Sequence, residues 1–308
     1  MKPNDHSDLA VQAVDDIEHI SGTFPGYRRA HARGRCYKGI FTPNGKAAPL
    51  TTAPHLQTEP VPVIVRFSNS SPNPGHSDAL TPVKGMSVQF QLGNGEITNL
   101  IAVTIPVFFA KSPEAFSEMF KLIKSAKTGL PNLKSLMKVL VKYPEGDAAV
   151  RILKEMHPPA SYGSAQYYSI HAFYFVDKEG RRQAVKYQWK PDAGLGMLKL
   201  KEAANRPEDY LDQEMDERLK QAPVGFDLDI QLGAEEDPTD DPTVLWPEDR
   251  QKMTVGHLEI TERLEDQGED LLFDPTVITD GIQLSEDKIL HFRHAAYKES
   301  YRRRIHNK

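Results

Sequence analysis

Three side chains near the end of the sequence have the types and the spacing to hold a flat, anionic molecule. Arg293, Tyr297 and Arg304 lie in a run from Ser285 that contains no glycine or proline. Ser285 is a good N-cap, so the run predicts a helix over residues 285–304. At 100° per residue the three side chains lie within about 40° of one another on one face. This layout suits one anionic cofactor, although a basic surface helix at a chain end would show the same pattern.

His31 is a candidate acid–base group because of the residues around it. Arg28 stands three residues before it, and Arg66-Phe-Ser68 occupies a predicted strand. A serine hydroxyl can decide which imidazole nitrogen carries the proton. A lone histidine is more often structural than catalytic, so the neighbouring residues are the signal. Arg66 lies in an apolar run and needs an anion, either an internal carboxylate or a carboxylate of a cofactor. Arg28 and Arg304 pose the same question.

Other candidate residues have an ordinary explanation beside a functional one. Phe108 and Phe116 belong to an aromatic cluster that core packing explains, although a flat cofactor would use the same surface. His171 lies in a predicted strand. Asp287 lies in the first turn of the predicted helix, where the helix dipole alone favours a carboxylate. It could also pair with Arg293 or His171.

The elements that must position these residues read as one α+β fold. Residues 8–21 have helical spacing and predict a short N-terminal arm within residues 1–24. Eight strand-like segments, mostly joined by short turns, predict an antiparallel β-barrel closed on itself. Helices are expected to flank the barrel as insertions, in one domain over residues 1–308. The strands are expected at 35–42, 62–68, 85–92, 96–105, 167–176, 183–190, 224–232 and 253–262, and the helices at 113–127, 131–143, 146–156 and 207–221.

Composition excludes several classes of function. The net charge is −5, from 38 basic and 43 acidic residues, and no basic tract precedes the last turns, so a nucleic-acid partner is not expected. No run reaches the ~18 apolar residues of a membrane span. The start has no apolar signal region, and one cysteine, Cys36, excludes an internal disulfide framework, so a cytoplasmic location is expected. Common zinc-protease, thiol-redox and nucleotide-binding signatures are missing from the sequence.

The sequence resembles the haem catalases, and most of all the small catalase-related peroxidases of bacteria. The matching motifs follow one order over about residues 17–306. They are Arg28-Arg-Ala-His31-Ala-Arg-Gly34, Val65-Arg-Phe-Ser68, Pro106-Val-Phe-Phe109 with Phe116, Asp241-Pro-Thr-Val-Leu-Trp-Pro247, Phe273-Asp-Pro275, Gly281-Ile282, Ser285-x-Asp287-Lys288 and Arg293-x-x-x-Tyr297.

The resemblance implies a role for each proximal residue. Tyr297 would be the axial iron ligand as tyrosinate, with its charge stabilised by the iron and by Arg293. Arg293, His171 and Asp287 would form the hydrogen-bond chain behind it. The haem would be b-type, because the chain has no CxxCH motif for covalent attachment.

On the other side of the haem, the resemblance implies that His31 takes the proton of a hydroperoxide and returns it to the leaving oxygen, which gives a ferryl haem. Ser68 would orient His31. Phe116 would stack on the haem beside Phe108. Arg28, Arg66 and Arg304 would bind the two haem propionates, supplying the missing anions.

Two departures from the family pattern point to the reaction. The sequence ends just after the proximal helix, so the later family regions and bound NADPH are not expected. The N-terminal arm that knits full catalases into tetramers is shortened, so a homodimer is expected in place of a tetramer. The family's distal asparagine, three residues before Pro106, is replaced by Val103, and Thr104 beside it points to the opposite face of a strand. Valine cannot hydrogen-bond a second peroxide as reductant.

These departures favour a peroxidase that reduces organic hydroperoxides and hydrogen peroxide with an external organic donor, with weak or no catalase activity and a role in the response to oxidative stress. The alternative is a fatty-acid hydroperoxide-rearranging enzyme of the allene oxide synthase or hydroperoxide isomerase type. A short true catalase is disfavoured by Val103, and a non-enzymatic haem carrier would not require the pair of His31 and Ser68.

Overall fold

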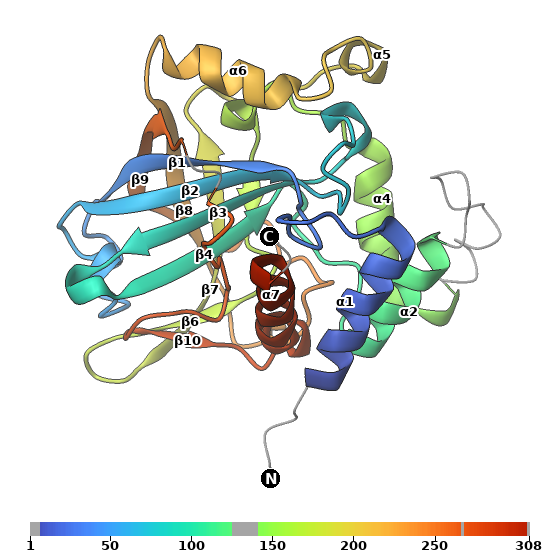
Figure 1. Ribbon diagram of the computed structural model, residues 1–308. Coiled ribbons are helices and arrows are strands. Elements are labelled where there is room, and N and C mark those ends of the chain that lie inside the picture. Colours follow the sequence, from blue (N-terminus) through green and yellow to red (C-terminus); the bar gives the residue numbers. More distant parts are fainter. Residues whose placement is uncertain (1–6, 125–140, 266–267, 307–308) are drawn as a thin grey trace.

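Eight antiparallel strands close into a barrel in the computed structural model, which describes residues 7–124, 141–265 and 268–306 (Figure 1). Each strand pairs with the next around the ring, and β9 returns to β1. This confirms the predicted barrel. The strands are β1 Gly34–Pro43, β2 Val61–Asn69, β3 Lys84–Gln91, β4 Ile97–Val103, β5 Tyr167–Tyr168, β7 Arg182–Pro191, β8 Val224–Leu232 and β9 Lys252–Arg263.

Alternation along the strands fills the barrel with apolar side chains. In β2, Val65 and Phe67 point into the packed interior, and Arg66 and Ser68 lie on the outer face. Trp189 on β7 is fully buried in the same interior. Burying one large apolar side chain contributes about 1.5–3 kcal/mol, so the barrel core stabilises a fixed outer wall.

The predicted strand over residues 167–176 is interrupted. It forms β5, and then β6 Phe173–Val176, which pairs with β7 and with β10 Ile282–Leu284. Between the two, the Ser169 Oγ accepts the backbone N–H of Tyr187 at 2.8 Å and donates to the carbonyl of His171 at 3.1 Å. The serine side chain replaces part of the strand ladder, and the chain around His171 leaves the sheet.

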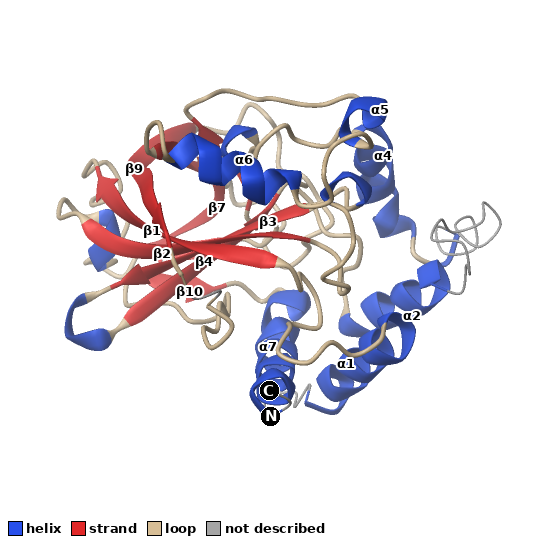
Figure 2. Cartoon of the chain, turned by 45° about the horizontal axis from the view of Figure 1, so that its top comes forward, coloured by secondary structure: helices blue, strands red, loops and turns tan. Residues whose placement is uncertain are grey.

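Helices pack against the outside of the barrel. Figures 1 and 2 show α7 beside the barrel, with α1 and α2 next to it. Ala10 and Ala13 of α1 pack against Phe292 of α7 and Phe116 of α2. The helix predicted at 131–143 lies mostly outside the described residues. The helices are α1 Ser7–Ser21, α2 Pro113–Lys124, α4 Asp147–Glu155, α5 Leu200–Ala203, α6 Tyr210–Leu219 and α7 Lys288–His306.

The last helix begins three residues later than predicted. The Oδ1 of Asp287 accepts the N–H groups of Ile289 at 2.8 Å and Leu290 at 3.2 Å, so Asp287 is the N-cap and Ser285 is not. A carboxylate at this position also interacts favourably with the helix dipole, which explains why it replaces the serine. Similarly, Pro207 precedes α6 rather than opening its first turn. Among the described residues, no helix has both the length and the apolar composition needed to cross a membrane.

Candidate active site

Four side chains form one hydrogen-bonded chain between the strand break and α7. Asp287 Oδ2 lies 2.6 Å from His171 Nδ1, and His171 Nε2 lies 2.8 Å from Arg293 Nη1. Arg293 Nη2 donates to the Tyr297 hydroxyl oxygen at 2.6 Å. Because a guanidinium only donates, His171 Nε2 must accept and its proton must lie on Nδ1, facing Asp287.

Burial explains the state of this chain. His171 and Asp287 are almost completely buried, and desolvation lowers the pKa of His171 despite the nearby Asp287 carboxylate. The neutral imidazole therefore holds Arg293 in place without competing for its charge. The Arg293 guanidinium is thereby directed at the Tyr297 oxygen. This brings together all four residues that the resemblance assigned to the proximal side.

His31 sits in a strained backbone conformation just before β1. Its φ of +53° lies in the left-handed region, where no other non-glycine residue of the described chain is found. Arg66 Nη2 donates to the carbonyls of His31 at 3.1 Å and of Ala32 at 3.2 Å, which holds this turn. The imidazole Nδ1 lies 3.0 Å from Ser68 Oγ, the predicted partner.

Two glycines that sequence reasoning missed make room for these side chains. A Cβ on Gly85 would lie 2.9 Å from His31 Nδ1 and 2.8 Å from Ser68 Oγ. A Cβ on Gly34 would lie 2.6 Å from Arg66 Cζ. A glycine inside or at the end of a predicted strand is the signal that could have marked both positions.

Val103 belongs to the same wall as Ser68. In the strand register Ser68 is paired with Gly85, and Gly85 with Val103, so the three positions face one side of the sheet. Thr104 does not replace the asparagine of the family pattern, because its Oγ1 accepts the backbone N–H of Lys84 at 3.0 Å. The wall next to His31 is therefore apolar at position 103.

The imidazole of His31 is neutral at physiological pH. Burial, followed by the positive charges of Arg66 and Arg293, lowers its pKa to about 3. Arg293, whose charge contributes to this shift, lies on α7 with Tyr297. A neutral histidine at that place can accept a proton.

Three arginines converge on one carboxylate, that of Glu269. Arg28 Nη1 lies 2.7 Å and Arg66 Nη2 3.4 Å from Glu269 Oε1, and Arg304 Nε lies 3.5 Å from Oε2. The sequence left an internal and an external anion open, and this internal carboxylate was not identified. Glu269 lies in a loop without periodicity, so only the need of three buried cations for an anion could have pointed to it.

Aromatic rings line the space near α2 and α7. Phe108 and Phe109 have ring centroids 4.4 Å apart, and Phe116 lies 6.0 Å from Phe108 and 6.0 Å from Phe292. Phe108, Phe109 and Phe116 are only partly buried. They offer an apolar surface that the barrel core does not cover.

These residues fit an iron porphyrin, which is a flat apolar ring with two carboxylates. Among the described residues, the cluster combines three arginines with the single carboxylate of Glu269, which is a surplus of two positive charges. Within the described part of the chain, the buried Nε of Arg66 also has no hydrogen-bond partner. The Tyr297 oxygen accepts a hydrogen bond from Arg293, and tyrosine is one of the haem ligands used by proteins.

The family model described as catalase matches residues 10–308, and the chain belongs to the catalase family. A catalase-related peroxidase of Mycolicibacterium paratuberculosis (strain ATCC BAA-968 / K-10) is 37% identical over 298 residues, which cover 95% of this chain and 94% of that protein.

A catalase-related peroxidase of Synechococcus elongatus (strain ATCC 33912 / PCC 7942 / FACHB-805) is 34% identical over 297 residues, or 95% of this chain and 88% of that protein. Catalase isozyme 2 of Nicotiana plumbaginifolia is 28% identical over 296 residues, which cover 90% of this chain and 60% of that protein. The chain is thus a haem peroxidase of the catalase family, and the predicted family and enzyme class are confirmed.

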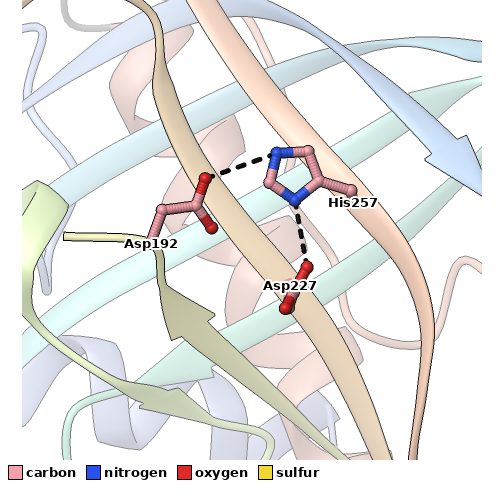
Figure 3. Close-up of side chains that lie close together, drawn as sticks. All are labelled: Asp192, Asp227 and His257. Carbon is pink, nitrogen blue, oxygen red and sulfur yellow. Dashed lines mark hydrogen bonds and ion pairs between the residues drawn. The ribbon is translucent and has the colours of Figure 1, made fainter. Parts of the chain in front are cut away.

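A separate cluster of ionisable side chains lies on the outer surface of the barrel. His257 on β9 lies with its Nδ1 3.0 Å from Asp227 on β8 and its Nε2 3.5 Å from Asp192, which follows β7 (Figure 3). Each imidazole nitrogen faces a carboxylate, and all three side chains are at least one third exposed. Pairing within the cluster accounts for it as a surface feature, and no residue of the candidate active site takes part.

Proposed function

We propose that this haem peroxidase reduces organic hydroperoxides, and hydrogen peroxide, with an external organic electron donor and has little catalase activity. The observation that carries the proposal is Val103 in the wall that also holds Ser68 and Gly85. Hydrogen peroxide acting as reductant needs a hydrogen-bonding group beside His31, and a valine side chain has none. The b-type haem is part of the same proposal.

When bound, the haem would supply the iron that receives the peroxide oxygen and the redox chemistry that follows. The Tyr297 oxygen would be its protein ligand, with negative charge stabilised by Arg293 through the bond at 2.6 Å. Arg28, Arg66 and Arg304 would hold the carboxylates of its edge.

His31 would move the proton. With its Nδ1–H donated to Ser68 Oγ, the Nε2 lone pair is free to take the proton of the hydroperoxide. The same nitrogen would then give that proton to the leaving oxygen, so that an alcohol or water departs. The strained turn at His31 fixes the direction of the imidazole ring, so the proton acceptor would already be oriented for the transfer.

The surroundings of His31 support an organic substrate. Val103 and Phe109 are only partly buried and belong to one apolar cluster with Ile105 and Val107, which would offer apolar surface next to the position of Val103. Alkyl or aryl hydroperoxides would bury apolar surface there, and each Å² buried would contribute about 25 cal/mol of binding free energy. Hydrogen peroxide has no such group and gains nothing from the apolar wall.

The first test compares donor oxidation and oxygen release. Purified wild type is supplied with cumene hydroperoxide and a phenolic donor, and separately with hydrogen peroxide in an oxygen electrode. We expect donor oxidation with little oxygen. The His31→Ala variant should lose donor oxidation by about 100-fold, within the usual range for a general acid–base, whereas the exposed His19→Ala on α1 should not. Unchanged activity in His31→Ala would overturn the proposed proton transfer.

The second test restores the missing amide. Val103→Asn should raise oxygen release from hydrogen peroxide by about tenfold, which corresponds to the ~1.4 kcal/mol of one added hydrogen bond in the reducing step. Oxidation of the phenolic donor with cumene hydroperoxide should fall at the same time. Conversion of a fatty-acid hydroperoxide by wild type without donor consumption would instead support the rearranging enzyme.

A further inference from the structure

The carboxylate of Glu269 is the common partner of three arginines that come from distant parts of the chain. Arg28 precedes β1, Arg66 lies on β2 and Arg304 lies in the last turns of α7. Arg66 and Arg304 are almost completely buried, and Glu269 is only 14% exposed. Buried cations at such proximity repel one another, so the arrangement needs an anion between them.

The loop that carries Glu269 is built around these arginines. Arg28 Nη2 donates to the carbonyls of Gly268 and Leu271, both at 2.9 Å. Arg304 Nε donates to the carbonyl of Glu269 at 2.5 Å, and its Nη2 to that of Leu271 at 3.3 Å. The carboxylate is therefore held from its backbone as well as from its side chain.

A glycine fixes the path of this loop. Gly268 has a φ of +64°, and a Cβ there would lie 2.5 Å from the sulfur of the buried Cys36. Only a glycine allows the loop to approach β1 so closely while it turns in the left-handed region. Glu269 follows at once, so its position is determined by packing rather than by a free side chain.

The cluster of Glu269 and the three arginines carries more positive than negative charge. Three guanidinium groups and one carboxylate leave a surplus of two positive charges. The Nε of Arg66 and the Oε2 of Glu269 are both buried, and neither has a hydrogen-bond partner in the described part of the chain. Burial lowers the pKa of Arg28 to about 9, with the charge of Arg66 as the next cause, but Arg28 still carries its charge at neutral pH.

We propose that Glu269 is a positioning residue for the haem edge, which neutralises one guanidinium and holds the three arginines so that they accept two further carboxylates. The site thereby selects a dianionic ligand. The inference rests on the proposed function, because haem with its two propionates is that ligand. Arg66 also holds the carbonyl of His31, so the same carboxylate supports the turn that carries the distal histidine.

The haem-loaded enzyme provides the test. Haem loss to excess apomyoglobin is followed by absorbance for wild type, Glu269→Gln and Asp270→Asn. The last variant removes a charge from an exposed neighbour in the same loop and is the matched control. We expect Glu269→Gln to lose haem at least about tenfold faster, corresponding to ~1.4 kcal/mol, and Asp270→Asn to resemble wild type.

A second ligand separates positioning from general damage. Each protein is also loaded with haem dimethyl ester, whose carboxylates are blocked. The ester should leave wild type and Glu269→Gln at rates that agree within about twofold, since neither ester group needs an ordered guanidinium. Equal acceleration for haem and ester would show a merely structural role and overturn the proposal.

The proposal would also be overturned if Glu269→Gln did not speed up haem loss. If Glu269→Gln retained haem as firmly as wild type, Glu269 would have no role in holding haem, and if the variant retained haem more firmly, Glu269 would be a competitor of the propionates. Failure of the proposed function would look different, because wild type would then load and retain haem normally but would not oxidise a donor with hydroperoxide.

Discussion

His31 shows how much of the proposed chemistry depends on backbone position. Its left-handed φ is costly for a residue with a side chain, by about 1–3 kcal/mol, and Arg66 stabilises the turn through two carbonyls. Gly85 has no side chain, and this leaves the space that the His31 ring occupies. The histidine is therefore aimed by residues that would not themselves touch a peroxide.

Gly85→Ala should disturb this aim. The new methyl would lie 2.9 Å from His31 Nδ1, so the ring must move and the peroxidase rate should fall about 10- to 100-fold. Gly93→Ala is the matched control, because its Cβ would meet nothing within 4 Å. Steady-state donor oxidation is the measurement, and a Gly85→Ala enzyme as fast as the Gly93→Ala enzyme would contradict the proposed role of the glycine.

The lowered pKa of His31 predicts the pH dependence of the reaction. An imidazole with a pKa of about 3 stays unprotonated, so the proton acceptor is not lost as the pH falls from 8 to 5. We expect kcat/KM for the hydroperoxide to be flat over this range, measured with a donor whose own ionisation lies outside it. An inflection near pH 6.5, the ordinary histidine value, would be incompatible with the buried neutral ring.

At the scale of elements, periodicity predicted the barrel because inward residues alternate with outward ones on most strands. It could not show the break between β5 and β6, since Ser169, Ile170 and His171 are all buried and the run reads as one strand. It also could not show that Asp287, rather than Ser285, caps α7, because both residue types are good caps. Tertiary contacts with Tyr187 and His171 decide the two cases.

The candidate site follows the same division. Residues in strands or on the last helix, such as Ser68 and Tyr297, could be proposed as site residues from their types and order. Glu269 and Gly85 were not, because their importance lies in what they face across the fold. No local pattern records that three arginines need one loop carboxylate.

Ser169→Ala tests the strand break. It removes the acceptor of the buried Tyr187 N–H and the donor to the carbonyl of His171. An unsatisfied buried amide costs about 1–3 kcal/mol, so the free energy of unfolding in urea should fall by that amount. A variant as stable as wild type would mean that the ladder closes again without the serine.

The whole molecule assembles the site from both ends of the chain. His31 lies before the first strand and Tyr297 on the last helix, so the space between them exists only once the barrel is closed and α7 is packed against it. Local stretches of sequence cannot form this site alone. Haem binding and completion of the fold are expected to be coupled.

Three buried histidines make the fold sensitive to acid. Burial lowers the pKa of His55 and of His31 to about 3, and lowers that of His171. Because the unfolded chain takes up these protons below pH 6.5 and the folded chain does not, stability falls with acid. His31 and His55 each contribute a slope of about 1.4 kcal/mol per pH unit down to about pH 3, and His171 contributes in the same direction.

His55 allows this slope to be measured away from the candidate site. It is buried against Phe90, with ring centroids 4.5 Å apart. His55→Leu should make the dependence of unfolding free energy on pH shallower by about 1.4 kcal/mol per unit between pH 6 and 4, measured by urea unfolding followed by tryptophan fluorescence. A variant with the wild-type slope would show that His55 titrates alike in both states.

The division of β2 into an inner and an outer face has a consequence for engineering. Val65 and Phe67 serve the interior, while Arg66 and Ser68 serve the site, in strict alternation along one strand. A library restricted to inward positions would search for heat tolerance, and one restricted to outward positions for new substrates. The two libraries can be screened separately and the selected substitutions combined, because the two sets of side chains lie on opposite faces of the sheet.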